Sequence, residues 1–489
     1  MKLKKLIKDL PFQAVKGSKE LEITGLSSNS KLVCPGHLFI AKKGTHDDGS
    51  KYIPEAVMAG AQALLTDMYD PGFKHITQLI HPDVKSMESS LADRFYDHPS
   101  QDLLMVGVTG TNGKTTSTFL IKYLLDQMGL KSGLIGTIEY IIGETRYPAT
   151  RTTPDVIMNH KMLREMIQQG SHAAVMEVTS HALDQNRVER IGYDVAVFTN
   201  LTPEHLDYHP SLQAYAEAKR KLFLSLNEKA VAVFNVDSDY SEFMSRGCLA
   251  QKITYGIENA ADFQARNIEM KPEGTFFELV FKGISYQSFT PMPGRFNLYN
   301  TLAAIATLGS KGFEIEAVIE ALKSFPGVPG RLEYVPNAEN LKVFVDFAHT
   351  QDALKNVFTS AREFCKGKLI GVFGCGGDRD RQKRPFMAQA VEEAADFAIV
   401  TNDNPRREDP ESIAQEVIEG FSGSNYIVIL DRREAIRHAL EKAGPNDAVI
   451  ICGKGHEPYQ IFAHKTVEFD DRKVVTEEVQ KLQSEKVQA

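Results

Sequence analysis

A glycine-rich segment, GTNGKTT, spans residues 110–116 between an apolar run and an amphipathic helical pattern. Glycines let backbone N–H groups approach a phosphate closely, and the start of the following helix favours an anion. Lys114 has the reach to contact the β- and γ-phosphates of a nucleotide, and the hydroxyl of Thr115 can bind Mg²⁺. The match to the G-x-x-x-x-G-K-[ST] pattern departs at Val108, which stands where the first glycine is expected. The segment predicts a loop that binds nucleotide phosphates.

A glutamate and a histidine stand at the ends of two further predicted strands. Glu177 lies in MEVTSH and His205 in NLTPEHLDYH. Alone, either is more typical of a surface group or a satisfied core residue. Together, near a phosphate loop, they favour a Mg²⁺ site, although Mg²⁺ prefers oxygen ligands to imidazole. Lys219 lies in the helical pattern YAEAKRKLF, and its spacing alone favours a solvated helix lysine.

A charged loop, TNDNPRRED, follows the apolar run ADFAIV. It holds Arg406 and Arg407 directly after Pro405, with acidic residues on both sides. A planar guanidinium can hold a carboxylate by two parallel hydrogen bonds, so the loop could read a charged ligand. An Asx-Pro turn with a solvated charge cluster explains the same residues. The loop alone leaves both interpretations open.

Most of the predicted strands alternate with helical patterns and end in polar loops, which indicates parallel α/β sheets that bind ligands beyond the carboxyl ends of their strands. A chain of 489 residues is too long for one core. Proline and glycine concentrate in FPGVPGRLE, where we place the last boundary. We predict three domains: a small α/β domain over residues 1–98, a central domain over 99–328, and a doubly wound domain over 329–489.

Composition excludes several classes of protein. The formal net charge of -8 argues against non-specific binding to nucleic acid. No apolar run approaches the roughly 18 residues that span a membrane. The 5 cysteines are scattered without metal-ligand spacing, which fits a reduced cytoplasm. We expect a cytoplasmic monomer.

In the order of its motifs the chain resembles the Mur ligase and folylpolyglutamate synthase superfamily, whose members form amide bonds by phosphorylating a carboxylate. The resemblance implies a central P-loop-type ATPase sheet, a Rossmann-like C-terminal sheet, and ATP and Mg²⁺ as cofactors. The ATP-binding residues that it implies are Gly110, Thr111, Asn112, Gly113, Lys114, Thr115, Thr116, Asn297, Asn300, Arg331 and Asp346. Gln351 stands where the family usually has proline after AHT or AHN, a change that affects turn stiffness only.

The same resemblance implies the metal site and the catalytic residues. The implied metal ligands are Thr115, Glu177, His205 and Lys219, the last as a carbamate formed with CO₂. The implied catalytic residues are Lys114, Lys219, His205 and Arg331. Burial that lowers the pKa of a lysine makes carbamate formation easier.

The N-terminal segment GLSSNSKLVCPGHLFIAKKGTHDDG resembles the UDP-binding region of the family members that act on muramoyl dipeptides. The residues implied for that substrate are Ser30, Thr152, Thr153, Thr179, Gln185 and Arg187. DNPR is typical of the members that add diaminopimelate, and lysine-adding members typically lack its arginine. The residues implied for diaminopimelate are Arg379, Asp403, Asn404, Pro405, Arg406, Gly453 and Glu457. In this interpretation Arg406 binds the distal carboxylate and Asp403 orients it, whereas Arg407 forms a solvated ion pair.

The expected reaction adds meso-diaminopimelate to the D-glutamate of UDP-N-acetylmuramoyl-L-alanyl-D-glutamate through an acyl phosphate. It belongs to peptidoglycan synthesis, and so to cell-wall biogenesis, cell shape and division. The nearest alternative is the same type of ligase adding L-lysine. Folylpolyglutamate synthase is disfavoured by the UDP-type N-terminal segment. A nucleotide-binding regulatory module without ligase activity would tolerate damage to Lys114, Glu177, His205 and Lys219, and all four are intact.

Overall fold

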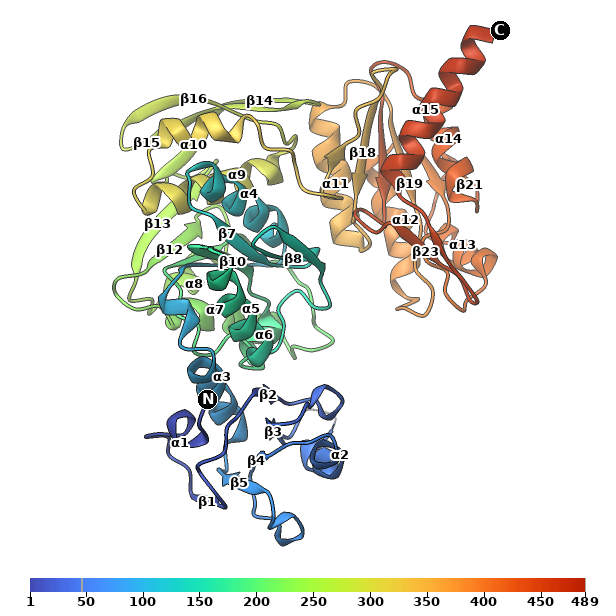
Figure 1. Cartoon of the computed structure of the whole chain (residues 1–489). Helices are drawn as coiled ribbons and strands as arrows, with labels where there is room; N and C mark the ends of the chain where they lie inside the picture. Colours follow the sequence, from blue (N-terminus) through green and yellow to red (C-terminus); the bar gives the residue numbers. More distant parts are fainter. Residues whose placement is uncertain (45–46, 489) are drawn as a thin grey trace. The chain divides into compact units, whose positions relative to one another are not determined.

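The computed structural model describes residues 1–44 and 47–488 (Figure 1). The chain divides into two compact units, Met1–Thr254 and Tyr255–Ala489, with the division inside β13 (Gln251–Gly256). Three regions of the chain carry α/β structure, each with its own hydrophobic core cluster. The predicted domain boundaries after residues 98 and 328 do not coincide with this division, and they stay predictions.

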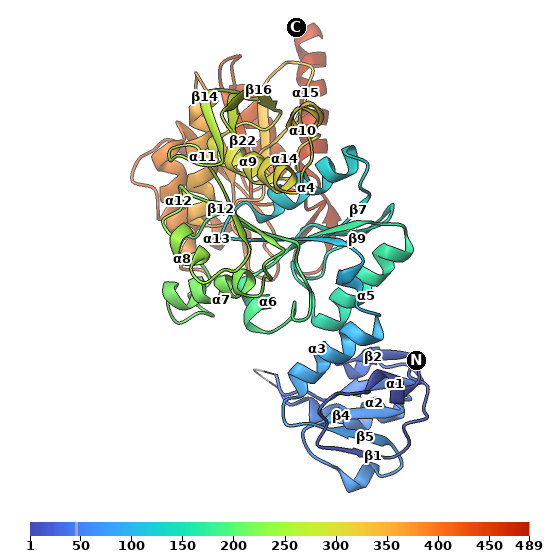
Figure 2. The same ribbon diagram turned by 90° about the vertical axis from the view of Figure 1, so that its left-hand side faces the viewer.

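The N-terminal sheet has four parallel strands and one antiparallel edge strand. Its order is β1 (Ala14–Lys16), β5 (Thr77–Ile80), β4 (Ala63–Thr66), β3 (His37–Ile40) and β2 (Gly25–Ser27). Its helices are α1 (Leu3–Leu6), α2 (Ile53–Met58) and α3 (Val84–Phe95). Leu91 of α3 shares a core cluster with Ile157 of α5 (Val156–Gln168), a helix of the central sheet (Figure 2). This apolar contact explains why the N-terminal sheet falls in the same compact unit as the phosphate loop.

The central sheet carries the strands that sequence patterns predicted. The order within the first unit is β12 (Val231–Asn235), β11 (Val195–Phe198), β6 (Leu104–Thr109), β10 (Ala173–Glu177), β7 (Ser132–Ile135), β8 (Glu139–Ile142) and β9 (Thr145–Pro148). The strands from β12 to β7 are parallel, and β8 and β9 extend the sheet as antiparallel strands. The helices are α4 (Lys114–Gln127), α5, α6 (Ser180–Asp184), α7 (Leu212–Leu224) and α8 (Ser241–Ser245). Parallel pairing brings the carboxyl ends of β6, β10 and β11 to one edge.

The second unit begins with an antiparallel ribbon of three strands that the sequence analysis did not predict. Its strands are β14 (Phe263–Lys271), β15 (Gly274–Phe281) and β16 (Ile284–Thr290). Helices α9 (Arg295–Ser310) and α10 (Ile315–Leu322) pack against it. Met270 and Phe296 also pack against the core of the last sheet, which accounts for the grouping of these segments in one unit.

The last sheet is a doubly wound α/β layer. Its order is β17 (Glu333–Tyr334), β18 (Lys342–Asp346), β22 (Ala448–Cys452), β19 (Leu369–Phe373), β20 (Phe397–Val400) and β21 (Tyr426–Val428), all parallel except β17. The helices are α11 (Gln351–Phe364), α12 (Lys383–Ala394), α13 (Pro410–Ile418), α14 (Arg432–Lys442) and α15 (Asp471–Gln488), and a hairpin joins β23 (Tyr459–Ile461) to β24 (Thr466–Glu468). Phe344 faces the cluster that includes α11 to α13, whereas Val343 and Val345 face the cluster that includes α14 and α15. This period-two alternation buries both faces of the strand.

The predicted α/β fold class is confirmed by these sheets. Among residues 1–44 and 47–488, no helix combines the length and the hydrophobicity that crossing a membrane requires.

A buried ion pair connects the two helices that cover one face of the last sheet. Arg432 begins α14 and Asp471 begins α15, and both side chains are fully buried. The guanidinium donates to the carboxylate from Nε at 2.8 Å and from Nη2 at 2.7 Å. It also donates to the carbonyl oxygens of Asn402 and Cys452, which follow β20 and end β22. One side chain therefore fixes the ends of two strands.

Replacing Arg432 with leucine should lower the free energy of unfolding of the second unit by about 3–5 kcal/mol, because Asp471 would stay buried without its partner. Lys473→Ala is the matched control, since Lys473 lies on the same helix as Asp471 but forms an exposed pair with Glu468. The control should barely shift the unfolding midpoint. Urea titrations followed by circular dichroism measure both variants, and equal losses would contradict the role given to Arg432.

Candidate active site

The phosphate loop occupies the turn between β6 and α4. Lys114 is the first residue of α4, and its amino group donates to the carbonyl oxygens of Gly110 at 2.9 Å and Thr111 at 2.7 Å. Asn200, just beyond β11, accepts from the backbone N–H of Asn112 at 2.9 Å through its side-chain oxygen. Neighbouring strand ends thus hold the loop at the start of a helix, where backbone N–H groups and the helix dipole favour an anion.

Lys219 is buried beside this loop and is not the solvated lysine that its spacing suggested. The residue is 1% exposed, and its amino group donates to Gly110 O at 2.7 Å. It also lies 4.5 Å from the ring centre of Tyr215, one helical turn earlier on α7. Burial, with help from the charge of Lys114, lowers the pKa of the Lys219 amine well below 10.5. An amine with a lowered pKa has more of the neutral, nucleophilic form that reacts with CO₂.

His205 belongs to a group of aromatic rings beside Lys219. Its ring centre lies 6.0 Å from that of Tyr215 and 4.9 Å from that of His181. Burial lowers the pKa of His205, which favours the neutral ring that can bind a metal ion. Burial and the neighbouring histidines lower the pKa of His181 to about 4. The sequence analysis assigned no role to His181 and Tyr215, although both lie inside motifs that it used, MEVTSH and YAEAKRKLF.

Glu177 ends β10 and is fully buried. Its carboxylate accepts from the backbone N–H of Thr137 at 2.8 Å and from the Thr137 hydroxyl at 3.0 Å. That hydroxyl also contacts the hydroxyl of Thr152 at 3.1 Å. Thr153 donates to the carbonyl oxygen of Glu177 at 2.7 Å. Two of the residues predicted for the muramoyl substrate therefore lie directly beside a predicted metal ligand.

The other residues predicted for that substrate continue the same network. Thr179 caps α6, and its backbone N–H donates to the hydroxyl of Thr153 at 3.2 Å. Arg187 donates to the carbonyl oxygen of Thr153 at 3.0 Å and to the side-chain oxygen of Gln185. Ser30 lies apart from them, next to α2, where its hydroxyl donates to Glu55 at 2.6 Å. All of these residues except Ser30 therefore belong to one continuous hydrogen-bonded network.

The donors near the phosphate loop fit a Mg²⁺ ion that is shared with phosphates. In the part of the chain that the structure describes, no three His, Cys, Asp or Glu side chains gather into a metal cage. Mg²⁺ usually takes one or two carboxylates and completes its shell with phosphate oxygens and water. The buried carboxylate of Glu177 and the hydroxyl of Thr115 are oxygen donors of this kind.

In the second unit, the residues predicted for the nucleotide lie on α9 and around the end of β18. Asn297 is fully buried and donates to the carbonyl oxygen of Pro293 at 2.9 Å. Asn300 donates to the side-chain oxygen of Asn297 at 3.3 Å. The guanidinium carbon of Arg331 lies 5.3 Å from the ring centre of Phe347.

Asp346 ends β18, and its carboxylate holds the turn that follows Arg331. It accepts from the backbone N–H groups of Leu332 at 2.6 Å and Ala348 at 2.7 Å. Burial raises the pKa of Asp346, and the Arg331 charge opposes the rise. Leu332 has a φ of 43°, so this carboxylate stabilises a left-handed residue next to a predicted phosphate contact.

Arg406 lies in the loop after β20, and hydrogen bonds from both its backbone and its side chain hold it in place. Its backbone N–H donates to the carbonyl oxygen of Ile461 at 3.0 Å, and its Nη1 donates to that of Gly377 at 2.7 Å. A Cβ at Gly377 would overlap the carbonyl oxygen of Pro405, so only glycine permits this approach of the two loops. Among the described contacts the guanidinium bonds to Gly377 and not to Asp403, which the sequence interpretation had expected to orient it.

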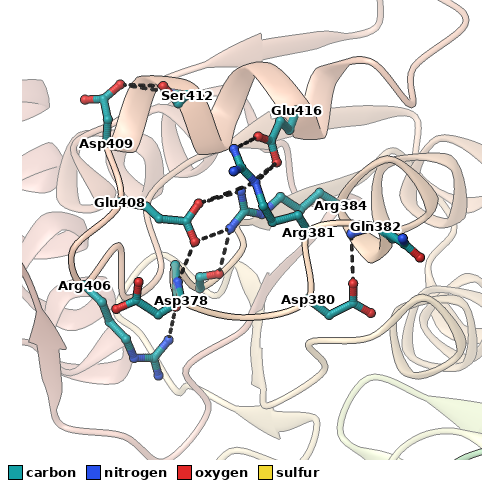
Figure 3. A network of polar contacts seen from close by, with 12 residues as sticks. Asp378, Asp380, Arg381, Gln382, Arg384, Arg406, Glu408, Asp409, Ser412 and Glu416 are labelled. Carbon is teal, nitrogen blue, oxygen red and sulfur yellow. Dashed lines mark hydrogen bonds and ion pairs between the residues drawn. The ribbon is translucent and has the colours of Figure 1, made fainter. Parts of the chain in front are cut away.

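A buried arginine fixes the two loops around Arg406 (Figure 3). Arg384 is fully buried and bonds to Glu408 at 3.0 Å and to Glu416 at 2.7 Å. Glu408 also accepts from the backbone N–H of Asp378, so the loops after β19 and β20 share one anchor. Arg407 instead pairs with Asp378 at 3.1 Å, with its side chain 82% exposed.

The remaining residues predicted for the amino acid surround the end of β22. Asn404 donates to Oε2 of Glu457 at 3.0 Å. Gly453 has a φ of 112°, and a Cβ there would overlap the Asp403 carboxylate. Arg379 is exposed on the loop after β19. Apart from Arg379, these side chains come together in one neighbourhood with Arg406, as their strand-end positions predicted.

Known proteins resemble the whole chain. The Mur ligase family catalytic domain matches residues 22–102, the Mur ligase middle domain matches 108–308, and the Mur ligase glutamate ligase domain matches 330–455. The chain is 40% identical over 487 residues to UDP-N-acetylmuramoyl-L-alanyl-D-glutamate--2,6-diaminopimelate ligase of Clostridium botulinum, covering 99% of this chain and 100% of that protein. It is 43% identical over 479 residues to the enzyme of the same name from Chlamydia abortus, covering 97% and 98%.

A solved structure agrees with these relatives. It is described as the structure of UDP-N-acetylmuramoyl-L-alanyl-D-glutamate--2,6-diaminopimelate ligase, and it covers 99% of both chains with a TM-score of 0.74 and 32% identity. The resemblance drawn from the sequence motifs is therefore confirmed. With three family domains in order and full-length relatives, the chain belongs to the Mur ligase family.

Proposed function

We propose that the chain uses ATP to join meso-diaminopimelate to the D-glutamate residue of UDP-N-acetylmuramoyl-L-alanyl-D-glutamate, as a cytoplasmic step of peptidoglycan synthesis that serves cell shape and division. The observation that best supports diaminopimelate as the substrate is that Arg406, Asn404 and Glu457 lie in one neighbourhood. Ile461 links Arg406 and Asn404. Its carbonyl oxygen accepts from the backbone N–H of Arg406, and its own N–H donates to the side-chain oxygen of Asn404. A guanidinium, an amide and a carboxylate suit a zwitterionic ligand end. The names of the full-length relatives support the same substrates.

In the first chemical step, an oxygen of the D-glutamate γ-carboxylate attacks the γ-phosphorus of ATP, and ADP leaves. Lys114 and the backbone N–H groups at the start of α4 stabilise negative charge on the phosphoryl oxygens. Arg331 supplies a second cation for these oxygens. In the second step the neutral amine of diaminopimelate attacks the acyl carbon, a tetrahedral intermediate forms, and phosphate leaves with the bridging oxygen. The amine loses one proton to the medium before its attack and one after.

Mg²⁺ would bind at Glu177, His205, Thr115 and a carbamate on Lys219, and when bound it neutralises charge on the transferring phosphate. Carbamate formation joins the Lys219 nitrogen to the carbon of CO₂ and releases one proton. The burial of Lys219 supports this chemistry, because it favours the neutral amine.

Asn297, Asn300 and Asp346 would position the adenosine. Thr152, Thr153, Thr179, Gln185, Arg187 and Ser30 would hold the UDP-linked substrate.

For diaminopimelate, Arg406 would bind the distal carboxylate and Glu457 the distal ammonium. Asp403, Pro405, Gly453 and Arg379 would shape the pocket around them. L-Lysine lacks the distal carboxylate, so it would leave Arg406 without its partner. A buried site that expects a charged group rejects an analogue that lacks it more strongly than an apolar pocket does. Arg406 is therefore the residue that favours diaminopimelate over L-lysine.

We expect Lys219→Ala to be nearly inactive, with partial rescue by short carboxylic acids that replace the missing anion. Lys219→Arg should not restore activity, because a guanidinium supplies only positive charge. Lys221→Ala is the control, since Lys221 lies on the same helix but is exposed and pairs with Asp184. Labelling with isotopic bicarbonate and carbon NMR should show a carbamate signal in the wild type and in Lys221→Ala. The same signal in Lys219→Ala would place the modification elsewhere.

Arg406→Ala should raise the KM for meso-diaminopimelate strongly and leave those for ATP and the UDP-linked dipeptide nearly unchanged. The loss of one partner of a desolvated charge pair costs about 2–5 kcal/mol. Arg407→Ala is the matched control, and its exposed pair with Asp378 should contribute little. The measurement is phosphate release with meso-diaminopimelate and with L-lysine as acceptors. A wild type that prefers L-lysine would reject the proposed substrate, and a larger defect in Arg407→Ala would reverse the assignment.

A further inference from the structure

Lys454 is a buried lysine in the GKGHE segment directly after β22. Its side chain is fully buried, and its amino group lies between two residues of the proposed amino-acid pocket. It donates to Oδ1 of Asn404 at 3.1 Å and to Oε2 of Glu457 at 3.4 Å. Burying an amino group is costly unless its hydrogen bonds are satisfied, and Asn404 and Glu457 supply the acceptors.

The contact with Lys454 fixes which way the Asn404 amide points. The amide oxygen accepts from Lys454 Nζ and from the backbone N–H of Ile461 at 2.9 Å. The amide nitrogen donates to Oε2 of Glu457 at 3.0 Å. If the amide were reversed, its NH₂ group would face two other N–H donors, and its oxygen would face a carboxylate. The amino group of Lys454 thus selects one orientation of the side chain.

The same contact gives the two carboxylate oxygens of Glu457 different surroundings. Within the described residues, the hydrogen bonds of its carboxylate all fall on Oε2, from Asn404 and from Lys454. Oε1 is then the atom that can accept from a ligand. The Glu457 side chain is 22% exposed, so this carboxylate is partly open to solvent, whereas the Lys454 side chain is fully buried. A carboxylate held from behind presents one oxygen in a fixed direction.

Resting on the proposed function, we infer that Lys454 is a positioning residue that sets recognition of the distal ammonium of the amino-acid substrate by holding Asn404 and Glu457 in one arrangement. Lys454 does not touch the substrate. It acts through Glu457 Oε1, which would accept from the ammonium. The consequence is a preference for substrates that carry both a distal carboxylate and a distal ammonium over those that carry the carboxylate alone.

The test compares meso-diaminopimelate with α-aminopimelate, which keeps the reacting amine and the distal carboxylate but lacks the distal ammonium. The readout is the ratio of kcat/KM for the two acceptors. The wild type should strongly prefer meso-diaminopimelate. Lys454→Met should reduce that ratio roughly 10- to 100-fold, the range expected for losing an aligned hydrogen bond to a charged group. The KM values for ATP and the UDP-linked dipeptide should stay unchanged.

Three further variants separate positioning from simple stabilisation. Lys454→Gln keeps an N–H donor and should lose less of the ratio than Lys454→Met. In an Asn404→Ala background, Lys454→Met should cost much less than it does alone, because residues that act as a unit are non-additive. Lys473→Met, an exposed lysine of the same unit, is the control and should keep the wild-type ratio. Circular dichroism checks that each variant is folded.

The outcomes distinguish the inference from the proposed function. If the wild type does not use meso-diaminopimelate, the proposed function fails and the inference falls with it. If the wild type uses it and a folded Lys454→Met keeps the full preference over α-aminopimelate, only the inference is overturned. If Lys454→Met does not fold, the ratio in Lys454→Gln decides: a reduced ratio supports positioning, and an unchanged ratio rejects it.

Discussion

The ion pair between Arg432 and Asp471 is the constraint on which the second unit's loops depend. Both charges are removed from water, a cost that is recovered only when every donor and acceptor is used. Arg432 largely meets this condition, because four of its five N–H groups bond to the carboxylate and to the carbonyl oxygens of Asn402 and Cys452. Those carbonyls belong to the ends of β20 and β22, and the two loops that follow carry Asn404, Arg406 and Glu457. Arg432 therefore fixes the starting points of both loops.

The first unit positions its site by a different arrangement, in which cations share one backbone acceptor. Lys114 and Lys219 both donate to the carbonyl oxygen of Gly110. Lys114 lies at the start of α4, whereas Lys219 is buried between α7 and the loop. Their mutual repulsion adds to burial in lowering the pKa of Lys219. The loop thus combines a lysine at a helix start with a buried amine whose pKa is lowered.

The strands of the parallel sheets were predictable, because β6, β10, β18 and β22 are apolar runs bounded by polar loops. The antiparallel strands β14 to β16 were not, since they are mostly half-buried or exposed, carry many polar residues, and form no continuous apolar run. Strand-end placement predicted which residues would gather, and within each unit most of them do.

Burial and contact partners could not be predicted in the same way. The spacing of Lys219 on α7 did not reveal that the loop after β6 covers it. Lys454 and Arg384 stand in segments whose letters fit solvated charges equally well. Their partners Asn404 and Glu408 come from a strand end far away in the sequence. Such partners are decided by tertiary structure.

Arg406 has a φ of 52°, a left-handed conformation that side chains with a Cβ adopt at some cost. The backbone bond to Ile461 holds this conformation whatever the side chain is, because it uses only the N–H group. Any residue that replaces Arg406 must therefore adopt this left-handed conformation, whatever the chemistry of its side chain. Glycine, asparagine and aspartate enter the left-handed region most readily, whereas valine, isoleucine and threonine are poorly tolerated there. The residues that can replace Arg406 at the lowest conformational cost are therefore mainly small or polar.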